Sequence, residues 1–412
     1  MPREKSIAER FEAYVDAVGG RLHKPNRRFL RDALFGLLES RSTLLSQIGR
    51  ALNEPRRLIH TEKRLSRGLS SKRYDDAAVE ADYLALAAPI LRDERFPRPT
   101  IAVDTTDISK PRAKKMPYLA GVHDGSKGEL GYGYSVISIE AVGTRGRRLP
   151  LLTRLFSSTS PEYTSHNAAI FAAVGRVAPH VPQDAHWVFD SGFDGHNFFK
   201  RFDEFGLRYS VRLKLGGKRT LFTPLGNLPP HALMLACPRP HRHRTRKQGR
   251  SSSVDVQLGW VQDVFVQRYK AGGNVSGTGG ETRYSVVFAS SAQLGEEPLA
   301  ILTTEDVRTA EDAARVVDLY LERWGVEEAH RFMKQGFDLE DLRALTWTGV
   351  QRMAQLVFLA YGFLAQLVHG PRAQVERVAA TFRAFGPIPT YLYYRLLEGI
   401  GRHLLRSMDS GP

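Results

Sequence analysis

The sequence has 412 residues, more than one ordinary domain contains, and so indicates two or three domains. Hydrophobic residues make up 42% of it, which allows a substantial core and excludes global disorder. The net charge of +15 favours a polyanionic partner such as nucleic acid, a basic enzyme without such a partner being the alternative. The single cysteine, Cys237, excludes both an intrachain disulfide framework and a cysteine-based zinc site.

Neither the N-terminal segment nor the longest apolar stretch has the features of a membrane protein. The first twenty residues are charged and lack the apolar core of a secretory signal. The longest apolar stretch, Met353–Val368, contains two glutamines and falls short of the ~18–20 residues that span a bilayer. We therefore expect a cytoplasmic protein without membrane contact, in which this stretch forms a buried helix.

Residues 1–75 are predicted to be helical, because apolar residues recur there at helical spacing between Gly and Pro punctuation. From Met1 to Tyr74 the segment carries 17 Lys and Arg against 8 Asp and Glu, a net charge of +9. A short basic helical domain of this kind predicts binding to DNA ends, although a solvated helical bundle is the alternative. Residues 76–96 are expected to form a linker.

The segment 97–214 is predicted to fold as strand, strand, strand, helix, strand, helix, strand, which is the order of an α/β core of the ribonuclease-H-like type. The sequences on which this order depends are PTIAVDTTDIS, GYGYSVISIEAVG, RLPLLTRLFSS, HNAAIFAAVGRVA, AHWVFDSG, GHNFFKRFDEFG and LRYSVRLK.

Residues 215–298 differ in character and are predicted to be a β-rich insertion with flexible hairpin tips. The tract Arg239–Arg250 holds six Lys and Arg and no acid, so it is expected to touch phosphate, unless it is only a solvated loop. The core resumes at 299–345 with a long helix capped by Thr309 and Asp312. Residues 346–412 are predicted to be helical and to form a dimer contact.

The long helix is expected to run unbroken through AEDAARVVDLYLERWGVEEAHRFMKQG. At 100° per residue, one stripe about 80° wide collects an aromatic hydroxyl, a carboxylate and three cations, while apolar residues lie opposite. The stripe consists of Tyr320, Arg323, Glu327, Arg331 and Lys334. An ordinary salt-bridged surface would look similar. A lone carboxylate among cations also suits a metal ligand beside a phosphate backbone.

This pattern resembles the signature of the DDE transposases of the insertion-sequence-four group, which is Tyr, two residues, Arg, three residues, Glu, six residues, Lys. Here YLERWGVEEAHRFMK carries it in register. The segment AVDTT resembles the first catalytic strand of that group and VFDSGFDGH the second, which identifies Asp104 and Asp190 as the partners of Glu327. The resemblance extends over about residues 97–370.

The resemblance implies that Asp104, Asp190 and Glu327 are catalytic and hold two Mg²⁺ ions, with Mn²⁺ as a substitute. Two such ions in an in-line displacement activate one oxygen and stabilise the leaving one, and carboxylates are the ligands they prefer. The partner implied is double-stranded DNA, both element ends and target, handled by a homodimer in a bacterial, nucleoid-associated cut-and-paste reaction. The expected DNA-contacting residues are Tyr320, Arg323, Arg331, Lys334, Arg212 and Lys214.

One departure concerns a tryptophan of that group on which a flipped base stacks, because its position here is Leu299. Trp260, the only tryptophan of the insertion, is the candidate for this stacking, and a core role in the insertion is the alternative. Two further functions stay open: a catalytically idle DNA-binding regulator, and a metal-dependent nuclease that cuts without joining.

Overall fold

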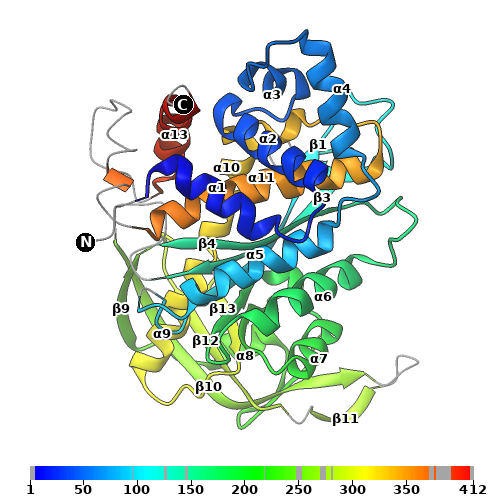
Figure 1. Ribbon diagram of the computed structural model, residues 1–412. Coiled ribbons are helices and arrows are strands. Elements are labelled where there is room, and N and C mark those ends of the chain that lie inside the picture. The colour runs from blue at the N-terminus through cyan, green and yellow to red at the C-terminus, as the bar shows by residue number, and fades with distance from the viewer. Residues whose placement is uncertain are drawn as a thin grey trace.

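The computed structural model describes residues 5–94, 96–124, 128–143, 147–217, 219–246, 253–269, 275–279, 282–370, 375–376 and 391–408. A large mixed β-sheet forms the centre of this part of the chain, and helices cover it (Figure 1).

The predicted helices of the N-terminal segment are present. They are α1 (Ile7–Val18), α2 (Lys24–Ser40), α3 (Leu45–Ala51) and α4 (Leu58–Leu69), followed by α5 (Asp76–Leu91). The prediction of a linker at 76–96 was wrong, because α5 occupies most of it. Asp75 caps α5. The buried residues of α5, Tyr83 and Leu84 among them, belong to the main hydrophobic core.

The core segment contains the predicted elements and one additional strand, β2. The elements are β1 (Thr100–Ser109), β2 (Ala120–Asp124), β3 (Glu129–Val142), β4 (Arg148–Phe156), α6 (His166–Val177), β5 (His186–Phe189), α7 (His196–Glu204) and β6 (Arg208–Arg212). Across the sheet the strands lie in the order β4-β3-β1-β5-β6. Strands β1, β5 and β6 are parallel to one another, and β3 is antiparallel to β1.

The segment 215–298 is rich in strands, as predicted. It contains β7 (Leu221–Thr223), β8 (Gly226–Leu228), α8 (Pro230–Ala236), β9 (His241–Arg246), β10 (Ser253–Tyr269), β11 (Val275–Gly279) and β12 (Tyr284–Ser290). Strand β13 (Leu299–Thr303) pairs with both β6 and β12, so these strands extend the core sheet. Half of the basic tract belongs to β9, which pairs with β10, Arg239 donates to the carbonyl of Met234 at 3.0 Å, and residues 247–250 lie outside the described residues.

The long helix is broken, contrary to the prediction. It consists of α9 (Ala310–Glu322), which has the expected capping box, and α10 (Gly325–Gly336). Between them, the amides of Arg323, Trp324 and Val326 donate to carbonyls three residues back, a tighter pattern than the α-helical one. The stripe of five residues is therefore split between two helices.

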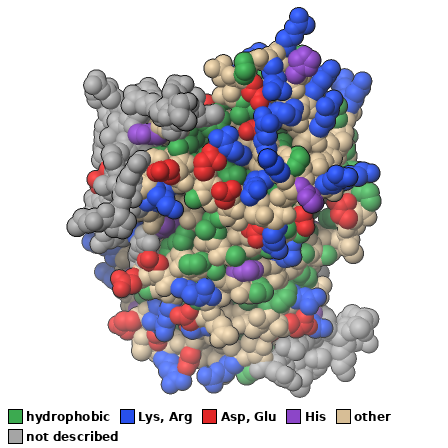
Figure 2. Space-filling model, in the orientation of Figure 1, with side chains coloured by type: hydrophobic (Ala, Val, Ile, Leu, Met, Phe, Trp, Pro, Cys, Tyr) green, Lys and Arg blue, Asp and Glu red, His purple; other side chains and the backbone are tan. Residues whose placement is uncertain are grey.

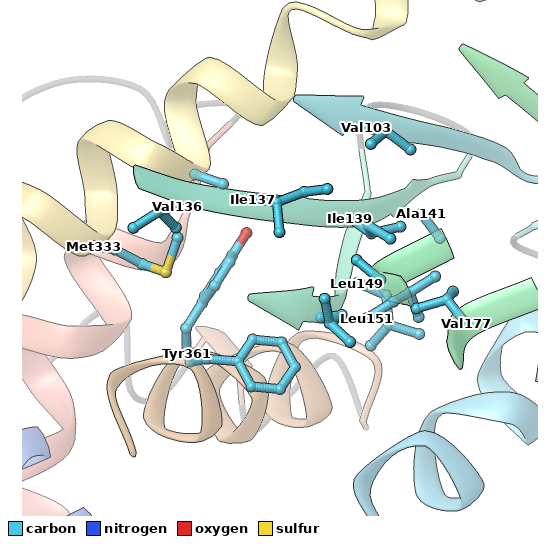
Figure 3. Packing of buried hydrophobic residues seen from close by; sticks show 14 of the residues in the cluster. Val103, Val136, Ile137, Ile139, Ala141, Leu149, Leu151, Val177, Met333 and Tyr361 are labelled. Carbon is cyan, nitrogen blue, oxygen red and sulfur yellow. The ribbon is translucent and has the colours of Figure 1, made fainter. Parts of the chain in front are cut away.

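The last described helices are α11 (Trp347–Val368) and α13 (Tyr393–Met408). Nearly all of α11 is buried against β4 and the N-terminal helices, so α11 cannot supply the dimer contact expected from this region. Residues as far apart as Ile7 and Leu404 share one hydrophobic core, and residue 75 marks no break in packing. Figure 3 shows Tyr361 of α11 and Met333 of α10 meeting the sheet residues Val136 and Ile137 in this core. No helix of the described residues has the length and apolar character needed to cross a membrane.

Candidate active site

Asp104 and Asp190 are brought side by side by the parallel pairing of β1 with β5. Ala102 is paired with Val188 and Val103 with Phe189. One further step in this register sets Asp104 opposite Asp190, on strands about 4.8 Å apart. Because side chains alternate along a strand, both acids share the face of Ala102 and Val188, which packs against Val326 of α10.

The local sequence explains how Asp190 is held. It follows the last residue of the buried strand β5, and its carboxylate accepts a hydrogen bond from the Gly192 amide at 2.8 Å. Asp190 therefore caps the short turn Ser191–Phe193, the role expected of an Asp-Ser-Gly sequence. This bond leaves the second carboxylate oxygen available to a ligand.

Glu327 of α10 is linked to Asp104 through Arg323, which lies between them. The Arg323 guanidinium lies 3.4 Å from Asp104 and 3.3 Å from Glu327. The Arg323 and Asp104 side chains are 8% and 11% exposed, whereas that of Glu327 is 52% exposed. The three acids thus form one cluster that is closed on the sheet side and open to solvent on the helix side.

The electrostatics of the cluster favour an additional cation. Burial, together with the charges of Asp190 and Glu327, raises the pKa of Asp104 to about 7, although Arg323 opposes this shift. The same three acids raise the pKa of Arg323 against the effect of its burial. Three carboxylates share the one guanidinium of Arg323, so an additional cation at this cluster would lower the pKa of Asp104.

The donor set fits hard divalent cations, because it consists of carboxylate oxygens from three separate elements. In the arrangement described, no three acidic, His or Cys side chains of the described residues are grouped closely enough to hold one metal ion. Arg323 lies between two of the predicted ligands instead. Its guanidinium therefore occupies the space where cationic charge is required.

Arg212 and Tyr320 lie beside this cluster, as the resemblance predicts. Arg212 ends β6 on the same sheet face as Asp190, because Val211 is paired with Phe189. Tyr320 is buried in the core beneath α9, which raises its pKa, while the neighbouring Arg323 and Arg212 oppose the shift. Tyr320 is therefore enclosed here rather than presented to a ligand.

The other three predicted cations are more distant. The Lys334 amine donates to the carbonyl of Asp107 on β1 at 2.6 Å, and so fixes α10 to the sheet. Arg331 is exposed and pairs with Glu328 on its own helix. Lys214 is exposed beyond the end of β6, and its backbone amide donates to Asp194 at 2.7 Å.

Trp260 lies in the middle of β10 rather than at a hairpin tip. Its ring packs on His241, with centroids 5.1 Å apart, and against the core beneath α9. Leu299 is buried in that same core. In this structure both positions are packing residues, which is the alternative that the sequence left open for Trp260.

Sequence reasoning missed the buried support of the joint between α9 and α10. Arg148, the first residue of β4, lies 3.5 Å from Glu140, and its guanidinium fills the space beside Gly325. Burial raises the pKa of Glu140 to about 7 and that of Glu322 to about 7, although Arg148 opposes both shifts. The only sequence signal of this contact is a glycine within an otherwise helical pattern.

Two comparisons with known proteins gave matches, one with a protein family and one with a solved structure. The family model described as the transposase DDE domain matches residues 95–363, well over half of the chain and a span that includes all three acids. Among solved structures, the chain is similar to the piggyBac transposase in its synaptic complex with hairpin DNA. The sequence identity is 11%, the match covers 98% of this chain and 80% of that one, and the TM-score is 0.42.

Proposed function

Since the chain belongs to the family of transposases with a DDE domain, we propose that it cuts the ends of a mobile DNA element and joins the 3′-OH ends to target DNA. The register of Tyr320, Arg323, Glu327 and Lys334 supports its assignment to the insertion-sequence-four group. The strand order β4-β3-β1-β5-β6, in which only β3 runs against the other four strands, supports a ribonuclease-H-like core.

The observation that carries the proposal is the convergence of Asp104, Asp190 and Glu327 around Arg323. We propose that these three carboxylates hold two Mg²⁺ ions, for which Mn²⁺ can substitute. When bound, the ions supply activation of the attacking oxygen and stabilisation of the leaving oxygen. Asp104, Asp190 and Glu327 would supply the carboxylate ligands from two strand ends and one helix.

The cations of the chain then bind the DNA backbone. Arg323, which lies between Asp104 and Glu327, would donate to a phosphate, and Arg212 would donate from the neighbouring strand end. A guanidinium suits this task because its planar donors match phosphate oxygens. Held in this way, the scissile phosphate faces the open side of the acidic cluster.

The proposed surface for the element ends lies on α3 and α4. Figure 2 shows Lys and Arg side chains gathered at the end of the molecule that these helices form. The exposed cations of this region are Arg50, Arg56, Arg57, Lys63, Arg67, Lys72 and Arg73. Because two ends must be handled together, we propose a homodimer in the DNA complex.

The experiment uses a plasmid that carries the element ends. Asp104→Asn, Asp190→Asn and Glu327→Gln should each abolish Mg²⁺-dependent nicking while binding to end DNA, measured by gel shift on the same preparations, is retained. Glu328→Gln is the matched control, because this acid neighbours Glu327 but pairs with Arg331. Wild-type nicking by any of the first three variants would remove that residue from the proposed site.

A further inference from the structure

A groove of about 880 Å³ lies apart from the acidic cluster, between the N-terminal helices and two loops of the core. One wall comes from α3 and α4 and carries the hydroxyls of Ser66 and Ser70. The other comes from the loop after β1 and from the loop 340–345 that follows α10. The groove therefore joins the basic helices to the elements that position the acids.

The charge of this groove is positive. The loop 110–115 reads KPRAKK, and Arg112 and Lys115 line the groove with exposed side chains, as does Arg343 opposite. Within the described part of the chain, no ion pair joins these three cations to a carboxylate. Two acids also line the groove, Glu340 and Asp341. Glu340 is 3.3 Å from Lys334, so Asp341 is the acid that remains to offset the three cations.

The loop 340–345 is held by hydrogen bonds on both sides and presents an apolar side chain. The buried Lys110 amine donates to the carbonyls of Glu340 and, at 2.7 Å, of Leu342. On the other side, the hydroxyls of Ser70 and Thr346 are hydrogen bonded at 3.0 Å. Between these anchors Leu345 is 89% exposed. A leucine held out from a rigid loop gains nothing from the fold and is preorganised for a partner.

The distance from the groove to the acidic cluster can be compared with the spacing of phosphates in duplex DNA. Ser109, at the edge of the groove, is five residues beyond Asp104 on β1, which corresponds to about 17 Å at 3.3 Å per residue. Successive phosphates along one strand of DNA are about 3.4 Å apart along the axis. For a duplex whose axis follows β1, the groove would lie about five base pairs from a phosphate bound at the acids.

We propose that this groove holds duplex DNA beside the cleavage point, and that Leu345 enters the base stack there as a wedge. Apolar side chains such as leucine are inserted between base steps by proteins that kink DNA, and flanking cations hold the backbone. A second copy of the chain is disfavoured as the occupant, because it also carries a charge of +15. The inference rests on the proposed function, which supplies the DNA.

The experiment uses the full chain without divalent metal, so that DNA is bound and not cut. End duplexes carry 2-aminopurine at successive positions of the flank, because this base fluoresces more strongly when it is unstacked. One position, about five base pairs from the cleavage point, should brighten several-fold with the wild type and not with Leu345→Ala. Leu235→Ala is the matched control, since this leucine is 68% exposed on α8 and lies outside the groove. It should preserve the signal.

The cations are tested by the salt dependence of binding. Each of Arg112→Ala, Lys115→Ala and Arg343→Ala should reduce the log–log salt slope by about 0.9, the value for one phosphate contact. Unchanged slopes together with an unchanged 2-aminopurine signal in Leu345→Ala would overturn the proposal that the groove holds duplex DNA. Reduced slopes without any brightening would overturn the wedge alone. If the wild type neither binds nor nicks any duplex, the proposed function itself fails.

Discussion

Replacing Gly325 by alanine tests whether Arg148 sets the position of the catalytic helix. A Cβ atom at this residue would lie 1.3 Å from Nη2 and 1.7 Å from Cζ of Arg148. Ordinary contact requires roughly 3.5 Å, so either the guanidinium or α10 must move by roughly 2 Å. No rotation of a methyl group relieves the overlap.

Both responses are costly. Expulsion of the guanidinium would leave Glu140 buried without its cation, which costs about 3–5 kcal/mol while this carboxylate is charged, against which alanine contributes only about 1 kcal/mol of helix propensity. Movement of α10 would instead displace Glu327, two residues further on, and a misplacement of about 1 Å can cost about 100-fold in rate. We expect a net loss of about 2–4 kcal/mol of stability, a loss of nicking of at least about 100-fold, or both.

The assay combines urea unfolding with plasmid nicking on the same preparation. Gly175→Ala is the matched control, because its Cβ would lie 3.3 Å from the outer edge of the Phe205 ring, which can give way, and α6 gains helix propensity. This variant should equal or exceed the wild type in stability. If Gly325→Ala unfolds at the wild-type urea concentration and nicks normally, the positioning of α10 by Arg148 is refuted.

Three other predictions concern the acidic cluster, the joint between α9 and α10, and the basic surface of α4. Arg323→Gln should destabilise the metal-free protein and tighten Mn²⁺ binding in the absence of DNA, because Asp104 and Glu327 lose a competing cation; weaker binding by titration calorimetry would contradict this. Burial raises the pKa of Glu322 from 4.5 to about 7. The stability that comes from protonating Glu322 in the folded state is therefore fully present below pH 4.5 and is lost as the pH rises through 7. Glu322→Gln should therefore shrink the fall in unfolding free energy between pH 5 and 8 by up to about 3 kcal/mol, and an unchanged fall in urea titrations would refute the shift. Lys63→Ala should weaken end binding and reduce the log–log salt slope by about 0.9, and an unaltered slope would remove α4 from the DNA surface.

Much of the core could be predicted from the sequence because its strands and helices carry strong local patterns. The strand of Asp104 and the short strand ending at Asp190 are bounded by turn residues, and parallel pairing then brings their ends together. The helix α5 was also readable, since Val79, Tyr83 and Leu84 follow helical spacing. The prediction of a linker over 76–96 overlooked this spacing.

The break between α9 and α10 could not be predicted from local pattern. Helical periodicity continues across Arg323 and Trp324, and the contact of Gly325 with Arg148 of β4, which is distant in sequence, leaves no mark on that pattern. The extension of the core sheet into the insertion was equally hidden. It depends on β13 pairing with β6 on one side and β12 on the other, and strand neighbours distant in sequence leave no mark on either strand.

The most direct measurement is strand transfer. Pre-cut end DNA with free 3′-OH groups is incubated with the full chain, a supercoiled target plasmid and Mg²⁺, and the joined products are quantified. We expect joining by the wild type and by Glu328→Gln, and none by Asp104→Asn or without metal. Joining by Asp104→Asn would contradict the assigned site. A wild type that nicks DNA and never joins it would contradict the transposase and leave a nuclease.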